Sequence, residues 1–126
     1  MHELSLSHAA VETVLESITN LKVARVKRVT AIIGELSGIS LDAFRFAFPI
    51  AAADTLLEGC ELLIQLEPVT VYCPKCNETV TLKSITSFRC PVCQTLTGDL
   101  RSGKQFSIYS IDVELDAEPI NEYAHS

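Results

Sequence analysis

Four cysteines in two closely spaced pairs are the residues of this chain best suited to chemistry. Cys73-Pro74-Lys75-Cys76 and Cys90-Pro91-Val92-Cys93 share the Cys-x-x-Cys spacing and are separated by thirteen residues. Each pair can form a tight turn that directs two sulfurs to one point, and two such turns supply a tetrahedral zinc site. Four thiolates leave no open position for a substrate water, so the spacing predicts structural zinc at Cys73, Cys76, Cys90 and Cys93.

Two other uses of these four sulfurs remain open at the level of the sequence. The same spacing can hold iron, as in rubredoxin-like electron carriers, although those proteins usually have several aromatic residues near the metal and only Tyr72 and Phe88 are close here. Two disulfides are the other alternative. The start of the chain lacks the basic and apolar segments of a secretory signal, which favours a reducing, cytoplasmic setting and therefore a metal.

The first residues form a second candidate metal site. The Met1 amine, the backbone nitrogen of His2 and its imidazole can form fused chelate rings around one ion, and Glu3 can add a backbone nitrogen or a carboxylate. With deprotonated backbone nitrogens such a set suits the square-planar preference of Ni(II) or Cu(II). The simpler interpretation, a terminus without a function, is equally consistent with these residues alone.

The remaining residues predict no enzyme. We find no Ser/His/Asp or Cys/His constellation, and residues 34–38 have the wrong spacing for a phosphate loop and lack its Lys. Acidic residues outnumber basic ones by sixteen to ten, which disfavours nucleic acid as a partner. No apolar run approaches the ~20 residues of a membrane span. We expect His8 and His125 to be exposed and Cys60 to be a small buried apolar residue.

Hydrophobic periodicity predicts the elements that position these residues. A helix is expected over 4–20, with an N-cap at Ser5 or Ser7, and a strand over 25–37, in which Gly34 marks a bulge or a close backbone approach. A second helix, capped by Ser40, is expected over 41–53, with Pro49 kinking it or ending it near Phe48.

The second half of the chain is predicted to be mainly β-structure. Strands are expected over 60–67 and 105–115, and a short hairpin inside the cysteine segment joins 79–82 to 85–88. This order predicts an α+β fold, with two helices on a three-stranded sheet and an inserted zinc-ribbon-like domain. The predicted domains are 1–68 plus 104–116, a zinc-binding domain at 69–103, and a flexible tail at 117–126.

The chain resembles the HypA/HybF family of hydrogenase-maturation nickel-insertion proteins. The resemblance begins with Met1-His2-Glu3-Leu4-Ser5-Leu6 and covers nearly all of the chain to about Leu115. It is also carried by the segments Arg28-Val29-Thr30, Gly34-Glu35-Leu36-Ser37, Phe44-x-Phe46, Glu58-Gly59-Cys60, Ile111-Asp112-Val113-Glu114 and the two cysteine pairs. A Met-His-Glu start together with two Cys-x-x-Cys pairs is specific, whereas either feature alone is not.

The resemblance implies a nickel metallochaperone that is not an enzyme. It implies transient Ni(II) cargo at Met1, His2 and Glu3, structural Zn(II) at the four paired cysteines, and delivery to the large subunit of a [NiFe] hydrogenase with a HypB-type maturation GTPase as partner. Some relatives have a histidine beside the cysteine pairs, where this chain has Asn77 and Gln94. The alternative is a zinc-ribbon interaction module without nickel handling. The recipient enzyme and the choice between monomer and homodimer stay open.

Overall fold

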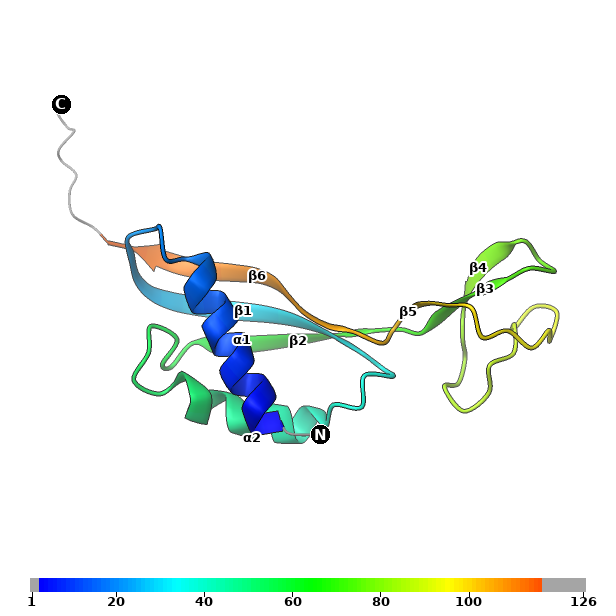
Figure 1. Ribbon diagram of the computed structural model, residues 1–126, viewed down its shortest axis with the longest axis horizontal. Coiled ribbons are helices and arrows are strands. Elements are labelled where there is room, and N and C mark those ends of the chain that lie inside the picture. Colours follow the sequence, from blue (N-terminus) through cyan, green and yellow to red (C-terminus); the bar gives the residue numbers. More distant parts are fainter. Residues whose placement is uncertain (1–2, 117–126) are drawn as a thin grey trace, which may run out of the picture. The chain divides into compact units, whose positions relative to one another are not determined.

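The computed structural model describes residues 3–116 as two helices and two small sheets (Figure 1). In chain order the elements are α1 (Glu3–Ser17), β1 (Val23–Gly34), α2 (Leu41–Ala52), β2 (Glu61–Glu67), β3 (Thr70–Cys73), β4 (Glu78–Thr81), β5 (Leu100–Ser102) and β6 (Phe106–Leu115). The predicted α+β class is confirmed. No helix within residues 3–116 has both the length and the apolar character needed to span a bilayer. The predicted tail, 117–126, lies outside the described residues.

The chain divides into two compact units. One, called the helical unit below, comprises Met1–Thr30, Ile39–Leu63 and Ile108–Ser126. The other, called the cysteine unit, comprises Ala31–Gly38 and Ile64–Ser107. The division falls within β1, β2 and β6, so each long strand contributes residues to both units. The domain limits predicted from the sequence, at 69 and 103, stay a prediction.

Helix α1 buries a continuous apolar stripe. Its buried residues recur at three- to four-residue spacing and are Ser7, Ala10, Val11 and Val14, followed after the helix by Ile18. Two expectations for this helix are wrong. The helix already begins at Glu3, so neither Ser5 nor Ser7 caps it, and although the predicted helix starts at Leu4, that side chain is 46% exposed and does not join the buried stripe.

Helix α2 starts as predicted and ends within one residue of the predicted limit of 53. The Ser40 side chain accepts a hydrogen bond from the Ala43 N–H at 3.3 Å, as expected of an N-cap. Of the two effects expected of Pro49, an end of the helix near Phe48 is wrong, because the helix runs through Pro49 to Ala52. Proline in the last turn removes only one helical N–H, and burial of Phe48, Ala51 and Ala52 favours continuation.

The first sheet has the strand order β2-β1-β6, which confirms the predicted three-stranded sheet. On the central strand, Arg28 reaches both edges, with its Nε 3.0 Å from Glu61 Oε1 and its Nη1 3.1 Å from Asp112 Oδ2. These carboxylates, Glu61 first, raise the pKa of Arg28. Such exposed ion pairs add little stability, so they serve mainly to favour this register of the strands.

The second sheet has the order β4-β3-β5 and was not predicted. Strand β3 pairs antiparallel with β4 from Thr70↔Thr81 to Cys73↔Glu78, and it pairs antiparallel with β5 on its other edge. The predicted hairpin is therefore wrong, since residues 85–88 form no strand. The first cysteine turn is itself the hairpin loop, and β4 turns back onto the residues before it rather than onto those after it.

Two glycines allow backbones to approach closely within the cysteine unit. The Gly34 N–H donates to the Gln105 carbonyl at 2.8 Å, and the Leu36 N–H donates to the Gly103 carbonyl at 2.7 Å. A Cβ on Gly34 would lie 2.2 Å from the carbonyl carbon of Gly103, which confirms the predicted close approach. Gly103 itself has a φ of 100°, a conformation that favours glycine.

Candidate metal centre

The four paired cysteines converge on one point. Their sulfurs all lie within 4.8 Å of one another, with 3.5 Å between Cys73 and Cys93 and 3.8 Å between Cys76 and Cys90. A tetrahedron with metal–sulfur bonds of about 2.3 Å has sulfur–sulfur edges of about 3.8 Å, so the spacing fits a four-thiolate metal site. The disulfide alternative is wrong for this structure, because all five cysteines are free.

Both cysteine turns are built in the same way. The Asn77 N–H donates to the Cys73 carbonyl at 2.7 Å, and the Gln94 N–H donates to the Cys90 carbonyl at 2.8 Å. Asn77 and Gln94 have positive φ values of 60° and 67°. Asparagine tolerates this conformation better than most residues, whereas glutamine has no such advantage. The repeated geometry gives each Cys-x-x-Cys pair the same curvature.

Backbone amides point at the sulfurs inside each turn. The Cys76 N–H lies 3.4 Å from the Cys73 sulfur, and the Val92 N–H lies 3.4 Å from the Cys90 sulfur. Cys73 and Cys90, the first cysteine of each pair, are fully buried. Each buried sulfur therefore has a backbone amide as a polar partner within its own turn.

The Thr95 hydroxyl supports a third sulfur. Its oxygen lies 3.1 Å from the Cys93 sulfur. Hydrogen bonds from the side chain and backbone of Thr95 lower the pKa of Cys93 to about 6. Interaction with the neighbouring sulfurs, Cys93 first, raises the pKa of Cys76 to about 12. Thr95 was not singled out from the sequence, where a threonine two residues after a cysteine gives no distinctive signal.

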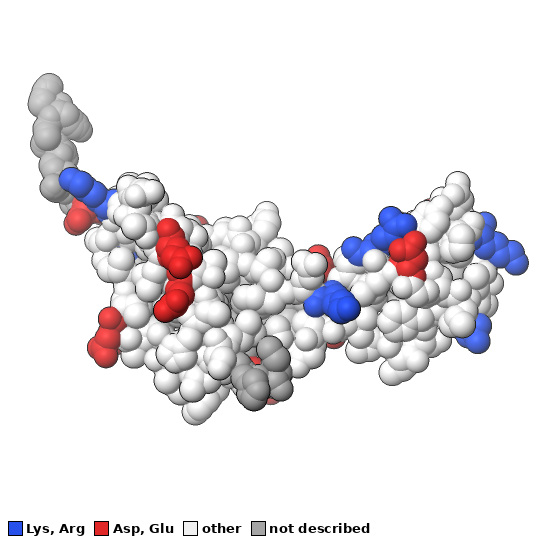
Figure 2. All heavy atoms as spheres, viewed as in Figure 1, with Lys and Arg blue, Asp and Glu red and all other residues white. Residues whose placement is uncertain are grey.

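Charge is distributed unevenly between the two units. Most acidic residues belong to the helical unit, whereas basic and acidic residues nearly balance in the cysteine unit. On the face drawn in Figure 2, Lys and Arg atoms are more prominent than acidic ones over β3, β4 and the loops beside them. One of these cations, Arg101, is paired with Asp99 at 2.9 Å. The basic residues are therefore interspersed with acids rather than gathered in a phosphate-binding stripe.

The second candidate site is described only in part. Met1 and His2 lie outside the described residues. Glu3 is the first residue of α1, and its Oε2 accepts a hydrogen bond from the Ser40 N–H at 3.1 Å. Because Ser40 is the N-cap of α2, this bond joins the beginnings of the two helices. Glu3 is thereby held beside the N-cap of α2.

Neither His8 nor Cys60 belongs to the group of four residues whose sulfurs converge, and His125 lies outside the described residues. His8 is exposed on α1, as predicted. Cys60 is partly buried beside β2, and this burial raises the pKa of its thiol. The structure thus brings together the four paired cysteines and leaves the fifth apart, in agreement with the spacing argument.

The fold and site define a small two-unit protein with a four-cysteine metal centre. The model of the family described as "Hydrogenase/urease nickel incorporation, metallochaperone, hypA" matches residues 1–113. The chain belongs to this family.

Curated relatives and solved structures agree with this assignment. The chain is 40% identical over 112 residues to the hydrogenase maturation factor HypA of Chloroflexus aurantiacus strain J-10-fl, covering 89% of this chain and 98% of that protein. It is 39% identical to the Roseiflexus sp. strain RS-1 factor of the same name, with 92% and 94% covered. The fold is similar to the solution structure of the Ni metallochaperone HypA from Helicobacter pylori, with a TM-score of 0.66, 21% identity, and 92% and 100% covered.

Proposed function

We propose that this chain binds Ni(II) at Met1, His2 and Glu3 and delivers it to the large subunit of a [NiFe] hydrogenase. The observation that carries the proposal is the match to a nickel-incorporation family over residues 1–113, which includes both the Met-His-Glu start and the four paired cysteines. In this proposal the protein is a binding and delivery protein rather than a catalyst.

The four cysteines are proposed to hold a resident zinc ion. The close fit of the sulfur spacing to a tetrahedral thiolate set supports zinc. When bound, zinc supplies folding energy by holding the two turns together. With four protein ligands the site has no position for exchangeable cargo, so a second donor set is needed for nickel.

The first three residues are proposed to be that second set. An amine, an imidazole and backbone nitrogens are donors that suit Ni(II), and they are harder ligands than the thiolates of the zinc centre. The hydrogen bond between Glu3 and Ser40 supports a location at the beginnings of α1 and α2. A site made largely from a chain terminus can open by movement of a few residues, which suits an ion that must be released.

Two partners follow from the proposed delivery. A HypB-type maturation GTPase would act with this chain, and the large subunit of the hydrogenase would receive the metal. The family description includes urease as well as hydrogenase. We place this activity in the cytoplasm, where the free cysteines of this structure would stay reduced.

Nickel titration of the untagged, zinc-loaded chain tests the proposal. We expect one nickel site per chain, in addition to one zinc ion that is bound more tightly. His2→Ala should abolish nickel binding and leave zinc content and far-UV circular dichroism unchanged. His8→Ala is the matched control, because it removes an exposed histidine of the same helical unit outside the motif.

The outcomes separate the alternatives. Unchanged nickel affinity in His2→Ala would show that the nickel site lies elsewhere. No nickel binding by the wild-type chain would favour a zinc-ribbon interaction module. Strong visible absorption of the purified protein before nickel is added would indicate iron in the four thiolates, as in a redox carrier.

A further inference from the structure

Thr97 is a buried polar residue that connects the approaches to both cysteine turns. Its hydroxyl donates to the carbonyl of Tyr72, the residue before Cys73, at 2.6 Å. Its N–H donates at 2.9 Å to the carbonyl of Phe88, two residues before Cys90. Thr97 is only 7% exposed. One residue thus fixes the separation of the segments that lead into the two turns.

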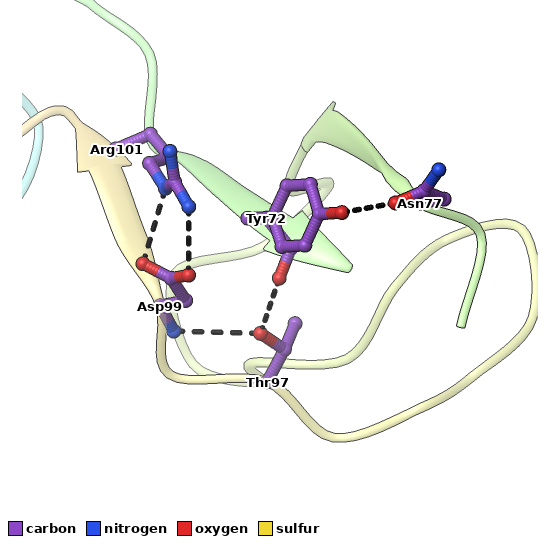
Figure 3. A network of polar contacts seen from close by, with 5 residues as sticks. All are labelled: Tyr72, Asn77, Thr97, Asp99 and Arg101. Carbon is purple, nitrogen blue, oxygen red and sulfur yellow. Dashed lines mark hydrogen bonds and ion pairs between the residues drawn. The ribbon is translucent and has the colours of Figure 1, made fainter. Parts of the chain in front are cut away.

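Tyr72 and Arg101 stabilise this connection through further hydrogen bonds and a ring contact (Figure 3). The Tyr72 N–H donates to the Asp99 carbonyl at 2.9 Å, and its phenol hydroxyl donates to the side-chain oxygen of Asn77, which follows Cys76. The Arg101 guanidinium lies 4.9 Å from the centre of the Tyr72 ring and is held by Asp99 through two hydrogen bonds, at 3.1 and 2.9 Å. The Asp99 N–H in turn points at the Thr97 hydroxyl, at 3.4 Å.

We propose that Thr97, supported by Tyr72 and Arg101, is a positioning residue that makes the four-cysteine centre retain zinc and refuse nickel. The inference rests on the proposed function, in which one chain handles both ions. Thiolates also bind Ni(II), so ligand type alone does not keep nickel cargo out of the cysteine site.

The coordination geometries that the two ions prefer can distinguish zinc from nickel at this site. Zinc is tetrahedral in structural sites, whereas Ni(II) also adopts a square plane, the geometry typical of its nitrogen- and oxygen-donor sites. Passing from one to the other requires one cysteine pair to rotate against the other. Thr97 is bonded to the segments preceding both pairs, so its hydrogen bonds oppose this rotation. Partners of this kind, outside the ligands themselves, commonly change metal affinity by about 10–100-fold when removed.

Three substitutions in the full-length, zinc-loaded chain dissect the network. Thr97→Val keeps the shape of the side chain and removes its hydroxyl, while Thr97→Ser keeps the hydroxyl and is the matched control. Arg101→Lys keeps the positive charge but loses the paired hydrogen bonds to Asp99, and it changes a side chain that is about half exposed.

The first measurement is the rate of zinc transfer to excess 4-(2-pyridylazo)resorcinol. We expect release about tenfold faster in Thr97→Val, a smaller increase in Arg101→Lys and a rate close to wild type in Thr97→Ser. The second measurement is thiolate-to-nickel charge-transfer absorption after incubation with equimolar Ni(II). This signal reports nickel on cysteine rather than on terminal nitrogen donors. It should appear in Thr97→Val and be absent from the wild type and Thr97→Ser.

Wild-type release rates and no nickel–thiolate absorption in Thr97→Val would overturn the inference. Faster release without that absorption would retain the role in holding zinc and overturn the role in refusing nickel. If Thr97→Val fails to fold, Arg101→Lys decides, and an unchanged release rate there overturns the inference. A wild-type chain that holds no zinc would instead overturn the zinc part of the proposed function.

Discussion

The helical unit and the cysteine unit are stabilised by different means. The helical unit buries large apolar side chains from both helices and β1, among them Phe44, Val14 and Val29, each fully buried. The apolar cluster of the cysteine unit that contains β3 has three buried members, Val69, Val71 and Leu82. Partly buried apolar side chains pack against this cluster, and hydrogen bonds around the four sulfurs add further order. Among the described residues the helical unit therefore has the larger apolar core, and the cysteine unit is the one in which a bound metal would add the most stability.

This contrast bears on the proposed function, in which one chain retains a zinc ion and passes on nickel. A small segment with little apolar area needs a staple, and a four-thiolate ion supplies it. The helical unit has an apolar core of its own, so under the proposed function nickel at Met1, His2 and Glu3 could be gained and lost while that core stays intact.

Removal of zinc should have the largest effect, and it should be confined to the cysteine unit. Structural zinc contributes on the order of 10 kcal/mol in small modules, so the turns at 73–77 and 90–95 should lose amide protection when the metal is chelated. Amides of α1 and α2 should keep theirs. Hydrogen exchange measured with and without chelator checks this, and added zinc should restore protection. Equal loss in both units would mean that they are not separately stabilised.

Phe44→Ala should destabilise the helical unit and leave the cysteine unit intact. Loss of a fully buried phenylalanine costs about 3–5 kcal/mol, so chemical denaturation followed by far-UV circular dichroism should show a large loss of helix stability. Zinc content should stay at the wild-type level. Phe46→Ala is the matched control, since Phe46 is 75% exposed on the same helix, and its effect should be within about 0.5 kcal/mol.

Gly34→Ala should destabilise the cysteine unit by an intermediate amount. The new methyl group would lie 2.2 Å from the Gly103 carbonyl carbon, and relief of this overlap should cost about 1–3 kcal/mol. Gly98→Ala is the control, because a Cβ there meets nothing within 4 Å. Thermal unfolding of the two zinc-loaded variants compares them. Equal unfolding temperatures of the two variants would show that the backbone at Gly34 can move away from Gly103 without loss of stability.

Thr95→Val should produce the smallest effect, a change in the pH dependence of zinc binding. Thr95 lowers the pKa of Cys93 to about 6, so loss of its hydroxyl should move that pKa upward towards its ordinary value. Protons then compete with zinc at higher pH, and the midpoint of zinc release on acidification should rise. Thr95→Ser should match the wild type. A midpoint that stays constant or falls in Thr95→Val would contradict this role.

Sequence reasoning identified the cysteine centre because its signal is local. Each ligand pair lies within four residues, and thiolate chemistry restricts what such pairs can hold. The helices and long strands were predictable for a similar reason, since periodicity over ten or more residues reports which face is buried. Predictions from the sequence were wrong where tertiary contacts outweighed a local conformational preference. Pro49 indicated a helix end, but the buried residues on either side keep the helix intact to Ala52.

The convergence of the four paired cysteines, the α+β class and the order of most elements could be predicted from the sequence, because neighbouring residues specify turns and amphipathic faces. Two features came only from the folded structure: β4 pairs with β3 across the first cysteine turn, and Thr97 forms hydrogen bonds to the carbonyls of Tyr72 and Phe88. These partners are separated by up to 25 residues, and their pairing depends on how the intervening chain folds. The spacing of residues along the chain does not predict such contacts, so the residues that position the cysteine turns could be identified only from the folded structure.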